Sequence, residues 1–230
     1  MDESNTVLVV TPHPDDAESG AGGTIAKWSA QGRKIILVVC TNGDKGTSDR
    51  SIVPADLAKT REKEQLEAAK ELGVSEVVFL RFPDQDLHDS SEFRERLVRE
   101  IRRHKPKTVV TVDPNRSYIR HRDHYYAGRV TLDAVFPYAR DHLAYPEHLG
   151  EGLEPHKVEE VYLWGSETPD TFLEITDTFK IKMDALYRHV SQMGLPREER
   201  EERSRARYAE VGKKIGVPLA EQFKHIELWR

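Results

Sequence analysis

The sequence predicts a Rossmann-like α/β fold, a three-layer sandwich in which helices cover both faces of a mostly parallel sheet. The first observation is that short apolar runs alternate with longer segments of helical spacing through residues 7–136. This alternation is typical of parallel strands joined by right-handed helical crossovers. The second observation is a cluster of polar side chains and glycines directly after the first apolar run, where open α/β sheets bind their ligands.

Four parallel strands are expected, because each apolar run is nearly continuous, as a strand covered on both faces requires. They span residues 7–10, 34–41, 76–80 and 108–112. Four helices are expected between and after them, with glycine or proline at most of their ends. The first is opened by the glycines at 20, 22 and 23 and ended by Gly32; the others are 55–72 closed by Gly73, 91–104 capped by Ser90 or Ser91, and 121–136 ended by Pro137.

Residues 141–230 are less regular and are expected to extend one domain that spans 1–230, since neither a repeat nor a clear linker interrupts the chain. The spaced apolar residues of the tail, 217–229, predict that it docks on the rest of the protein or against a neighbouring subunit. The other expected elements are a loop at 141–157, strands at 158–164 and 171–175, an amphipathic helix at 178–193 and a charged helix at 198–215.

Composition excludes two classes of partner. The chain has a net charge of −5 and a pI near 6.1, which gives no basis for nucleic-acid binding. No apolar stretch approaches the length of a membrane span, and the acidic start Met-Asp-Glu-Ser does not resemble a signal peptide. We therefore expect a cytoplasmic protein. Its single cysteine, Cys40, lies inside an apolar run and is expected to be a buried, unreactive thiol.

The polar cluster after the first strand is a candidate metal site. His13 and Asp16 stand three residues apart in a turn, where an imidazole nitrogen and a carboxylate oxygen can meet one ion about 2 Å away. Asp15, between them, would then lie beside the metal as a base that can take a proton from water. The alternative is a helix N-terminus whose carboxylates stabilise the helix dipole.

A second candidate cluster follows the fourth strand. His121 and His124 are three residues apart at an expected helix start, so both rings face the same side. One can bind the metal while the other faces the substrate, and two histidines with one aspartate leave an open position on zinc. Fe2+ or another divalent ion suits the same donors. Asp123 could hold a histidine in one tautomer, or be a simple helix N-terminal carboxylate.

The glycine cluster does not fit a dinucleotide-binding loop. The third glycine of that motif would fall at Ile25, and the second strand ends in Cys40-Thr41-Asn42 rather than in the acidic residue that would hold a ribose. We expect the glycines to let the helix pack close to the sheet.

Together, these motifs resemble a known family. One is His13-Pro-Asp-Asp-Ala-Glu18 followed by Gly-Gly-Thr at 22–24, and the other is His121-Arg-Asp-His124. Both are similar to the signatures of the PIG-L/LmbE family of zinc-dependent N-acetylglucosamine deacetylases, and the resemblance covers residues 6–133.

The resemblance implies a role for each group of the two clusters. It implies that zinc is held by His13, Asp16 and His124, that Asp15 is the catalytic base, and that His121 stabilises the oxyanion and can protonate the leaving amine. Whether Asp15 alone or both residues handle the protons stays open at this stage.

Three further residues are candidates for contacts to the substrate. Arg61 is similar to a family arginine that contacts sugar hydroxyls, Asp84 to a residue of a Pro-Asp loop, and Tyr118 could hydrogen-bond the oxyanion. The alternatives are an exposed helix charge for Arg61 and a turn-forming role for Asp84. The chain departs from the family at Arg122, where proline is usual. This arginine could point to solvent, or pair with an acidic substrate group or with Asp123.

The expected function is therefore a zinc-dependent hydrolase that removes an N-acetyl group from a glucosamine-containing small molecule or glycoconjugate. One alternative is an amidase for another acyl group of a sugar or thiol conjugate. The other is a non-catalytic sugar- or nucleotide-binding module of the same fold. The family resemblance also implies a homo-oligomer, a trimer or hexamer, to which the apolar residues of the late segments would contribute.

Overall fold

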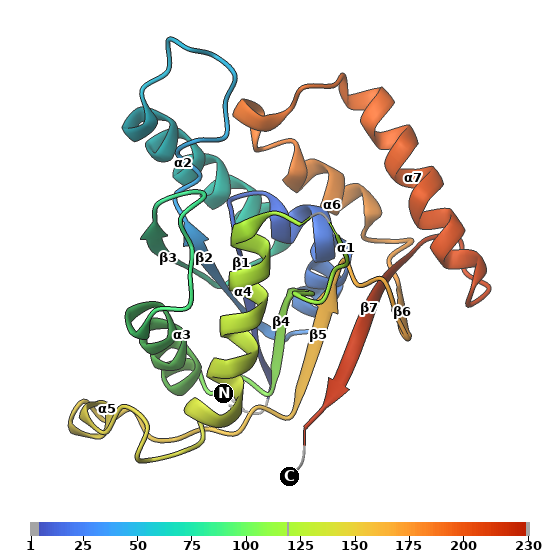
Figure 1. Ribbon diagram of the computed structural model, residues 1–230. Coiled ribbons are helices and arrows are strands. Elements are labelled where there is room, and N and C mark those ends of the chain that lie inside the picture. The colour runs from blue at the N-terminus through green and yellow to red at the C-terminus, as the bar shows by residue number, and fades with distance from the viewer. Residues whose placement is uncertain (1–4, 119, 229–230) are drawn as a thin grey trace.

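A computed structural model describes residues 5–118 and 120–228, and it contains one seven-stranded sheet (Figure 1). The strand order is β3-β2-β1-β4-β5-β7-β6. Only β7 runs opposite to its neighbours, because it pairs antiparallel with both β5 and β6 while the other recorded pairs are parallel. The strands are β1 (Thr6–Thr11), β2 (Lys34–Thr41), β3 (Glu76–Phe82), β4 (Thr108–Val112), β5 (Glu160–Trp164), β6 (Thr171–Glu174) and β7 (Ala220–Glu227).

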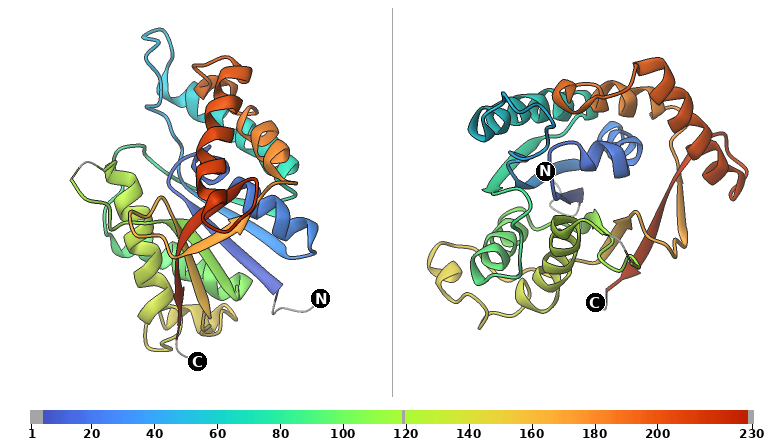
Figure 2. Two further views of the ribbon diagram at one scale, coloured as in Figure 1. Left: turned by 90° about the vertical axis from the view of Figure 1, so that its right-hand side faces the viewer. Right: turned by 45° about the horizontal axis from the view of Figure 1, so that its top comes forward.

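Helices lie on both faces of the sheet, which confirms the predicted fold class (Figure 2). One layer contains α1 (Asp16–Ala30), α2 (Pro54–Leu72) and α6 (Phe179–Leu186), and the other contains α3 (Ser91–His104) and α4 (Arg122–Asp133). Helix α7 (Arg197–Lys213) contacts β6 and β7 at the end of the sheet. The short elements are α5 (Glu147–Gly150) inside the expected loop, the π-helical turn η2 (Ala134–Tyr138) and the 3-10 turn η3 (Val190–Gln192).

Helix α1 begins earlier than predicted. It starts at Asp16, so the glycine cluster lies inside the helix rather than at its opening. A Cβ at Gly20 would stand 2.4 Å from the indole of Trp164, and one at Gly23 would stand 2.7 Å from the side chain of Ile175. The glycines therefore allow the helix to pack closely, as expected.

The long helix expected at 178–193 was wrong in extent. Helix α6 ends at Leu186, and the backbone N–H groups of Arg188 and His189 donate to carbonyls only three residues back. These tight turns carry the chain inward, so that His189 is fully buried. Helix α4 likewise ends at Asp133, and the π-helical turn η2 occupies the residues that were expected to complete it.

Strand β7 was not predicted, because the tail was expected only to dock. Charged and polar residues interrupt its apolar pattern, and one of them, Glu221, is buried. Its carboxylate accepts hydrogen bonds from the backbone N–H groups of Gly23 and Thr24 in α1, at 3.0 and 2.8 Å, and from the ammonium of Lys182 at 2.7 Å. A buried glutamate that is fully hydrogen-bonded gives no hydrophobic signal. Trp229, the last residue of the predicted tail, lies outside the described residues.

The core is centred on β1 and β2, where every residue except Lys34 is buried. Cys40 is fully buried there, as predicted, and burial raises the pKa of its thiol well above the usual range. Because β1, β2 and β4 are parallel neighbours, their carboxyl ends meet at one edge and place the following loops side by side. None of the described helices is both long and apolar enough to cross a membrane.

Candidate metal centre

The turn between β1 and α1 positions the first three polar groups. The backbone N–H and the hydroxyl of Thr41 both donate to the carbonyl of Pro12, at 2.9 and 3.0 Å, and tie the turn to β2. Asp15 then adopts φ 105°, a left-handed conformation that L-residues other than glycine rarely adopt. Such strain costs on the order of 1–3 kcal/mol and is concentrated at functional sites.

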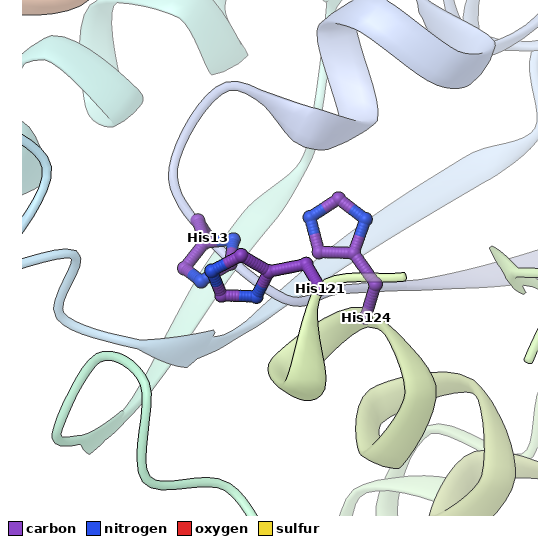
Figure 3. Close-up of side chains that lie close together, drawn as sticks. All are labelled: His13, His121 and His124. Carbon is purple, nitrogen blue, oxygen red and sulfur yellow. The ribbon is translucent and has the colours of Figure 1, made fainter. Parts of the chain in front are cut away.

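Three side chains converge where this turn meets the start of α4. Oδ2 of Asp16 lies 2.9 Å from Nδ1 of His13 and 3.1 Å from Nε2 of His124. The imidazoles of His13, His121 and His124 gather at the same point (Figure 3). Ligands bonded tetrahedrally to zinc at 2.0–2.1 Å stand roughly 3.3 Å apart. The distances from Asp16 Oδ2 to each of the two nitrogens are only slightly shorter than this, so Asp16 can share an ion with either histidine after a small expansion.

The histidines alone offer a second donor set, because nitrogens of His13, His121 and His124 all lie within 4.8 Å of one another. Hydrogen bonding argues against His121 as a ligand. Its Nδ1 accepts the backbone N–H of Asp123 at 3.2 Å, where His121 caps α4. A neutral ring that accepts at Nδ1 carries its proton on Nε2, and a protonated nitrogen cannot bind a metal. This hydrogen bonding favours Asp16 over His121 as the third donor beside His13 and His124, with His121 as an N–H donor.

The Nε2 atom of His13 faces two buried carboxylates. Its Nε2 lies 3.1 Å from Oδ2 of Asp123 and 3.1 Å from Oδ1 of Asp84. Asp123 is held in turn by the backbone N–H groups of Gln85 and Leu87, at 2.6 and 3.1 Å. A histidine that binds a metal through one nitrogen usually donates its other N–H to a carboxylate in this way.

The pKa values of this cluster reflect burial opposed by ion pairing. Burial lowers the pKa of His13, but hydrogen bonds to Asp123, Asp16 and Asp84 outweigh it and raise the pKa to about 11. Burial raises the pKa of Asp16, while hydrogen bonds from His124 and His13 drive it well below its usual range. Asp16 therefore stays ionised at neutral pH, as the ligand of a cation must.

Asp15 lies beside the convergent atoms without being one of them. Its backbone N–H donates to Oε1 of Gln65 at 3.3 Å, and its carboxylate lies 3.4 Å from Nη2 of Arg61. Burial and the charge of Asp16 raise the pKa of Asp15 to about 7, against the opposing effect of Arg61. A carboxylate with a pKa near neutrality can both take and return a proton.

The electrostatics of His121 agree with its role as a neutral donor. Burial lowers its pKa, and the neighbouring His13 and His124 lower it further. The ring is therefore neutral at pH 7, with the proton on the nitrogen that faces away from the helix backbone.

A comparison with known protein families identifies the family of this chain. Residues 8–135, more than half of the chain, match the family PIG-L, described as GlcNAc-PI de-N-acetylase. The chain belongs to the PIG-L family. The resemblance predicted from His13-Pro-Asp-Asp and His121-Arg-Asp-His is thereby confirmed.

Two relatives are similar to the chain in sequence, and one solved structure is similar to it in fold. Diacetylchitobiose deacetylase of Thermococcus kodakarensis is 34% identical over 81% of this chain and 69% of its own length. Mycothiol S-conjugate amidase of Streptomyces coelicolor is 30% identical over 74% of this chain and 64% of its own length. The solved N,N'-diacetylchitobiose deacetylase from Pyrococcus horikoshii has a TM-score of 0.91 at 33% identity, over 97% of this chain and 84% of that one.

Two of the residues predicted to contact the substrate, Arg61 and Asp84, are buried in this PIG-L protein. Arg61 is buried, so the alternative of an exposed helix charge is wrong; its guanidinium donates to the carbonyls of Gly43 and Pro14. Asp84 is buried against His13 and accepts the backbone N–H of Lys45 at 3.3 Å. Burial raises the pKa of Asp84, but the hydrogen bond from His13 outweighs it and lowers the pKa to about 2.

The structure does not bring Tyr118 to the site. Its side chain is fully exposed, and the backbone has φ 57°. Arg122 is also exposed, and its Nε donates to the carbonyl of Leu87 at 3.0 Å while its guanidinium lies over the ring of Tyr126. It does not pair with Asp123, because that carboxylate points inward to His13.

Sequence reasoning missed the support beneath Asp15. Gln65 is buried, and its amide bridges the Asp15 backbone and Oε1 of Glu18, the latter at 2.7 Å. The other oxygen of Glu18 lies 3.5 Å from Nε2 of the buried His189. The spacing of Arg61 and Gln65, four residues apart on α2, could have indicated one functional helix face. No sequence signal pointed to His189.

Proposed function

We propose that the protein is a metal-dependent N-deacetylase that hydrolyses the acetamide of a glucosamine-containing small molecule or glycoconjugate. The observation that carries the proposal is the convergence of Asp16 Oδ2, His13 Nδ1 and His124 Nε2, with Asp15 beside them. Diacetylchitobiose deacetylases at 33–34% identity support the reaction and the type of substrate. Zinc is the proposed metal, because two histidines and one carboxylate suit it and leave an open position; Fe2+ is the alternative.

A zinc ion held by His13, Asp16 and His124 would polarise the amide carbonyl and lower the pKa of water from about 15.7 to about 7. Asp15 takes a proton from the attacking water, because it is an ionisable group beside the ligands with a pKa near neutrality. The Nε2–H of His121 donates a hydrogen bond to the oxygen on which charge develops. Asp15, once protonated, returns that proton to the leaving amine.

The same proposal gives a positioning role to three further residues, Arg61, Asp84 and Asp123. Arg61 holds the strained turn by its bonds to Pro14 and Gly43 and faces the Asp15 carboxylate. Asp84 and Asp123 orient the His13 ring. Contacts of Arg61 and Asp84 with sugar hydroxyls remain predictions of the family resemblance, and a hydrogen bond from Tyr118 to the oxyanion remains a prediction from the sequence.

We extend the proposal to the whole chain. Residues 1–230 would form one domain, which is supported by the way β5, β6 and β7 complete the sheet begun by β1. A homo-oligomer, a trimer or hexamer, is proposed from the family resemblance, and the side chains of Phe136 and Leu143, 54% and 79% exposed, are apolar surface that such an assembly could cover. The cytoplasmic location stays a prediction from the sequence.

Cleavage of another acyl group is the second candidate function. It is favoured by the mycothiol S-conjugate amidase, which is 30% identical over 74% of this chain. The same groups would serve either amide, since the chemistry at the carbonyl does not depend on the length of the acyl chain.

Metal analysis combined with an amine-release assay tests the proposal. Purified protein is expected to hold about one zinc per chain and to convert N-acetylglucosamine or N,N'-diacetylchitobiose into acetate and the corresponding free amine. Asp15→Asn should keep the metal and lose about 10²–10⁴-fold in kcat, the range for a lost general base. His124→Ala should lose the metal, whereas His142→Ala, an exposed histidine outside the cluster, should not.

The outcomes separate the rival functions. One metal per chain without release of any acetyl group, but with hydrolysis of a longer acyl chain, would favour the amidase. Sugar binding that Asp15→Asn leaves unchanged, with no product from any substrate, would favour the binding module. Full metal content in His124→Ala would show that the donor set is wrong.

A further inference from the structure

A polar pocket of about 170 Å³ opens beside the metal centre. Asp16 and His124 form its wall toward the metal, and Trp164 at the end of β5 forms another part of its lining. Arg116 from the loop after β4 and Arg207 from α7 also line it, together with Gln222 of β7. Its volume is several times the roughly 30 Å³ share of one water molecule. We call it the arginine pocket.

Arg207 differs from most arginines on its helix. Three of the five arginines of α7 form ion pairs: Arg197 with Asp184, Arg203 with Glu199, and Arg205 with Glu201. Within the part of the chain that the structure describes, Arg207 has no carboxylate within ion-pair distance and lies only near the ring of its neighbour Tyr208. Its charge is therefore available to a ligand.

Arg116 also lacks an ion pair among residues 5–118 and 120–228. Its charge does act on the carboxylate of Glu167. Hydrogen bonds from Ser117 lower the pKa of Glu167, and Arg116 adds a smaller lowering. The Glu167 carboxylate is itself engaged, because it accepts the backbone N–H and the hydroxyl of Ser117, the latter at 2.7 Å.

Gln222 adds a hydrogen-bond donor to the lining of the pocket. Oε1 of Gln222 accepts from the ammonium of Lys214 at 3.2 Å, so the group that Gln222 can offer a ligand is its amide N–H. Asp16 is the acidic group of the lining, and its Oδ2 faces the two histidines that share the metal. Two guanidinium groups and an amide donor match an anionic oxygen group better than a sugar hydroxyl.

We propose that the substrate carries a carboxylate or phosphate close to the N-acyl group, and that Arg116 and Arg207 bind this anion in the arginine pocket. The inference rests on the proposed N-deacetylase function and names a narrower class of substrate for it: acylated amino sugars with an acidic substituent. Arg116 lies within residues 8–135, which match the family, whereas Arg207 on α7 lies outside them, so the pocket combines the matched segment with the C-terminal part of the chain.

Activity on matched substrates tests the proposal. The neutral substrate is N-acetylglucosamine, and the charged ones are its 1-phosphate, its 6-phosphate and N-acetylmuramic acid, which carries a carboxylate. The zinc-loaded wild type should have a kcat/KM at least about tenfold higher for one charged substrate than for the neutral one. Arg116→Gln and Arg207→Gln should each reduce that preference about tenfold and leave the neutral substrate unchanged. Arg205→Gln is the matched control, two residues away on α7 and already ion-paired.

A binding measurement separates this inference from the proposed function. Calorimetry compares glucosamine with glucosamine 1-phosphate, glucosamine 6-phosphate and muramic acid on the wild type and on Arg116→Gln/Arg207→Gln. Charge-selective binding that is lost in the double variant, without acetate release from any substrate, would retain the arginine pocket and reject the deacetylase. Acetate release from the neutral substrate, with equal affinity for charged and neutral ligands in wild type and variants, would retain the deacetylase and overturn the anion site. A preference for the phosphates over muramic acid, or the reverse, identifies the anion.

Discussion

Asp123→Asn is a stringent test of how the metal centre is supported. The fully buried Asp123 carboxylate takes three donors: Gln85 N–H and His13 Nε2 at one oxygen, and Leu87 N–H at the other. Asparagine has a single acceptor oxygen. If that oxygen faces Gln85 and His13, the new NH2 group opposes the N–H of Leu87; if it is flipped, two donors are opposed instead. The substitution therefore removes the negative charge behind His13 and leaves at least one buried N–H without an acceptor.

Two magnitudes follow from this change. A buried donor left without an acceptor costs about 1–3 kcal/mol of folding stability. Loss of the carboxylate that supports a metal-binding histidine typically weakens metal affinity 10–100-fold, which corresponds to about 1.4–2.7 kcal/mol. We expect zinc affinity to fall in that range while the fold is retained, because three direct ligands are unchanged.

The assay is a competition titration of zinc against a chromophoric chelator, with thermal unfolding of the same samples. Asp113→Asn is the matched control: Asp113 is also buried at the end of β4, but its recorded hydrogen bond accepts from the backbone N–H of Asn115 at 2.8 Å. Its asparagine Oδ1 can still accept that N–H, so Asp113→Asn should keep the zinc affinity of the wild type. If Asp123→Asn binds zinc within twofold of the wild type, the reasoning that Asp123 orients His13 is refuted.

Three further predictions concern acidity, the buried ion pair and close packing. Asp15 must be ionised to act as a base, and its pKa is about 7 before the metal lowers it, so kcat/KM should fall tenfold per pH unit below a midpoint at or under 7. Arg61→Gln should move the midpoint of the pH–rate profile upward. An unmoved midpoint would contradict the contact between Arg61 and Asp15. Lys182→Met should reduce the free energy of unfolding in urea by about 3–5 kcal/mol, because it leaves the buried Glu221 charge unpaired; Lys182→Met/Glu221→Gln should recover part of the loss, and an equally unstable double variant would argue against unpaired charge as the cause. Gly23→Ala should cost about 1–3 kcal/mol, because the new Cβ would stand 2.7 Å from Ile175, whereas Gly150→Ala, with no atom within 4 Å of the added Cβ, should change stability by a few tenths of a kcal/mol.

The parts of the fold that the sequence predicted well are those where local signals agree. Strand β2 was placed at the same residues as observed, because its apolar run ends in a polar loop. Helix α3 begins as predicted, and Oγ of Ser90 accepts the N–H of Phe93 at 3.1 Å. Gly73, with φ 70°, ends α2 where a left-handed residue was expected.

The sequence-based predictions failed where an element is held by buried polar contacts, because such contacts leave no apolar pattern in the sequence. The charged pattern of β7 gave no strand, because Glu221 is buried by hydrogen bonds to α1 and Lys182 rather than by apolar packing. The end of α6 was missed because no glycine or proline marks it, and what turns the chain there is the burial of His189 beside Glu18. Such contacts join residues far apart in the chain and leave no local periodicity.

The candidate site was likewise predictable from the sequence only in part. The convergence of His13, Asp16 and His124 was predictable, because the two motifs follow the neighbouring parallel strands β1 and β4 on the same edge of the sheet. The exclusion of His121 as a ligand required its hydrogen bond to the Asp123 backbone. The surroundings of Arg61 and Asp84 depended on loops whose paths the sequence did not specify.

The contacts of Glu221 also have a consequence for the order of synthesis. The middle of α1 obtains hydrogen bonds from residues made much later: Lys182 and Tyr208 donate to the carbonyl of Ser19, and Glu221 accepts from the amide of Gly23, 198 positions earlier in the chain. During translation, the turn with His13 and Asp16 is made early, but α1 obtains these hydrogen bonds only after nearly the whole chain has been synthesised. Such distant closure slows folding. A nascent chain arrested before β7 should therefore retain the metal-binding motifs as sequence while lacking a stable site for the ion.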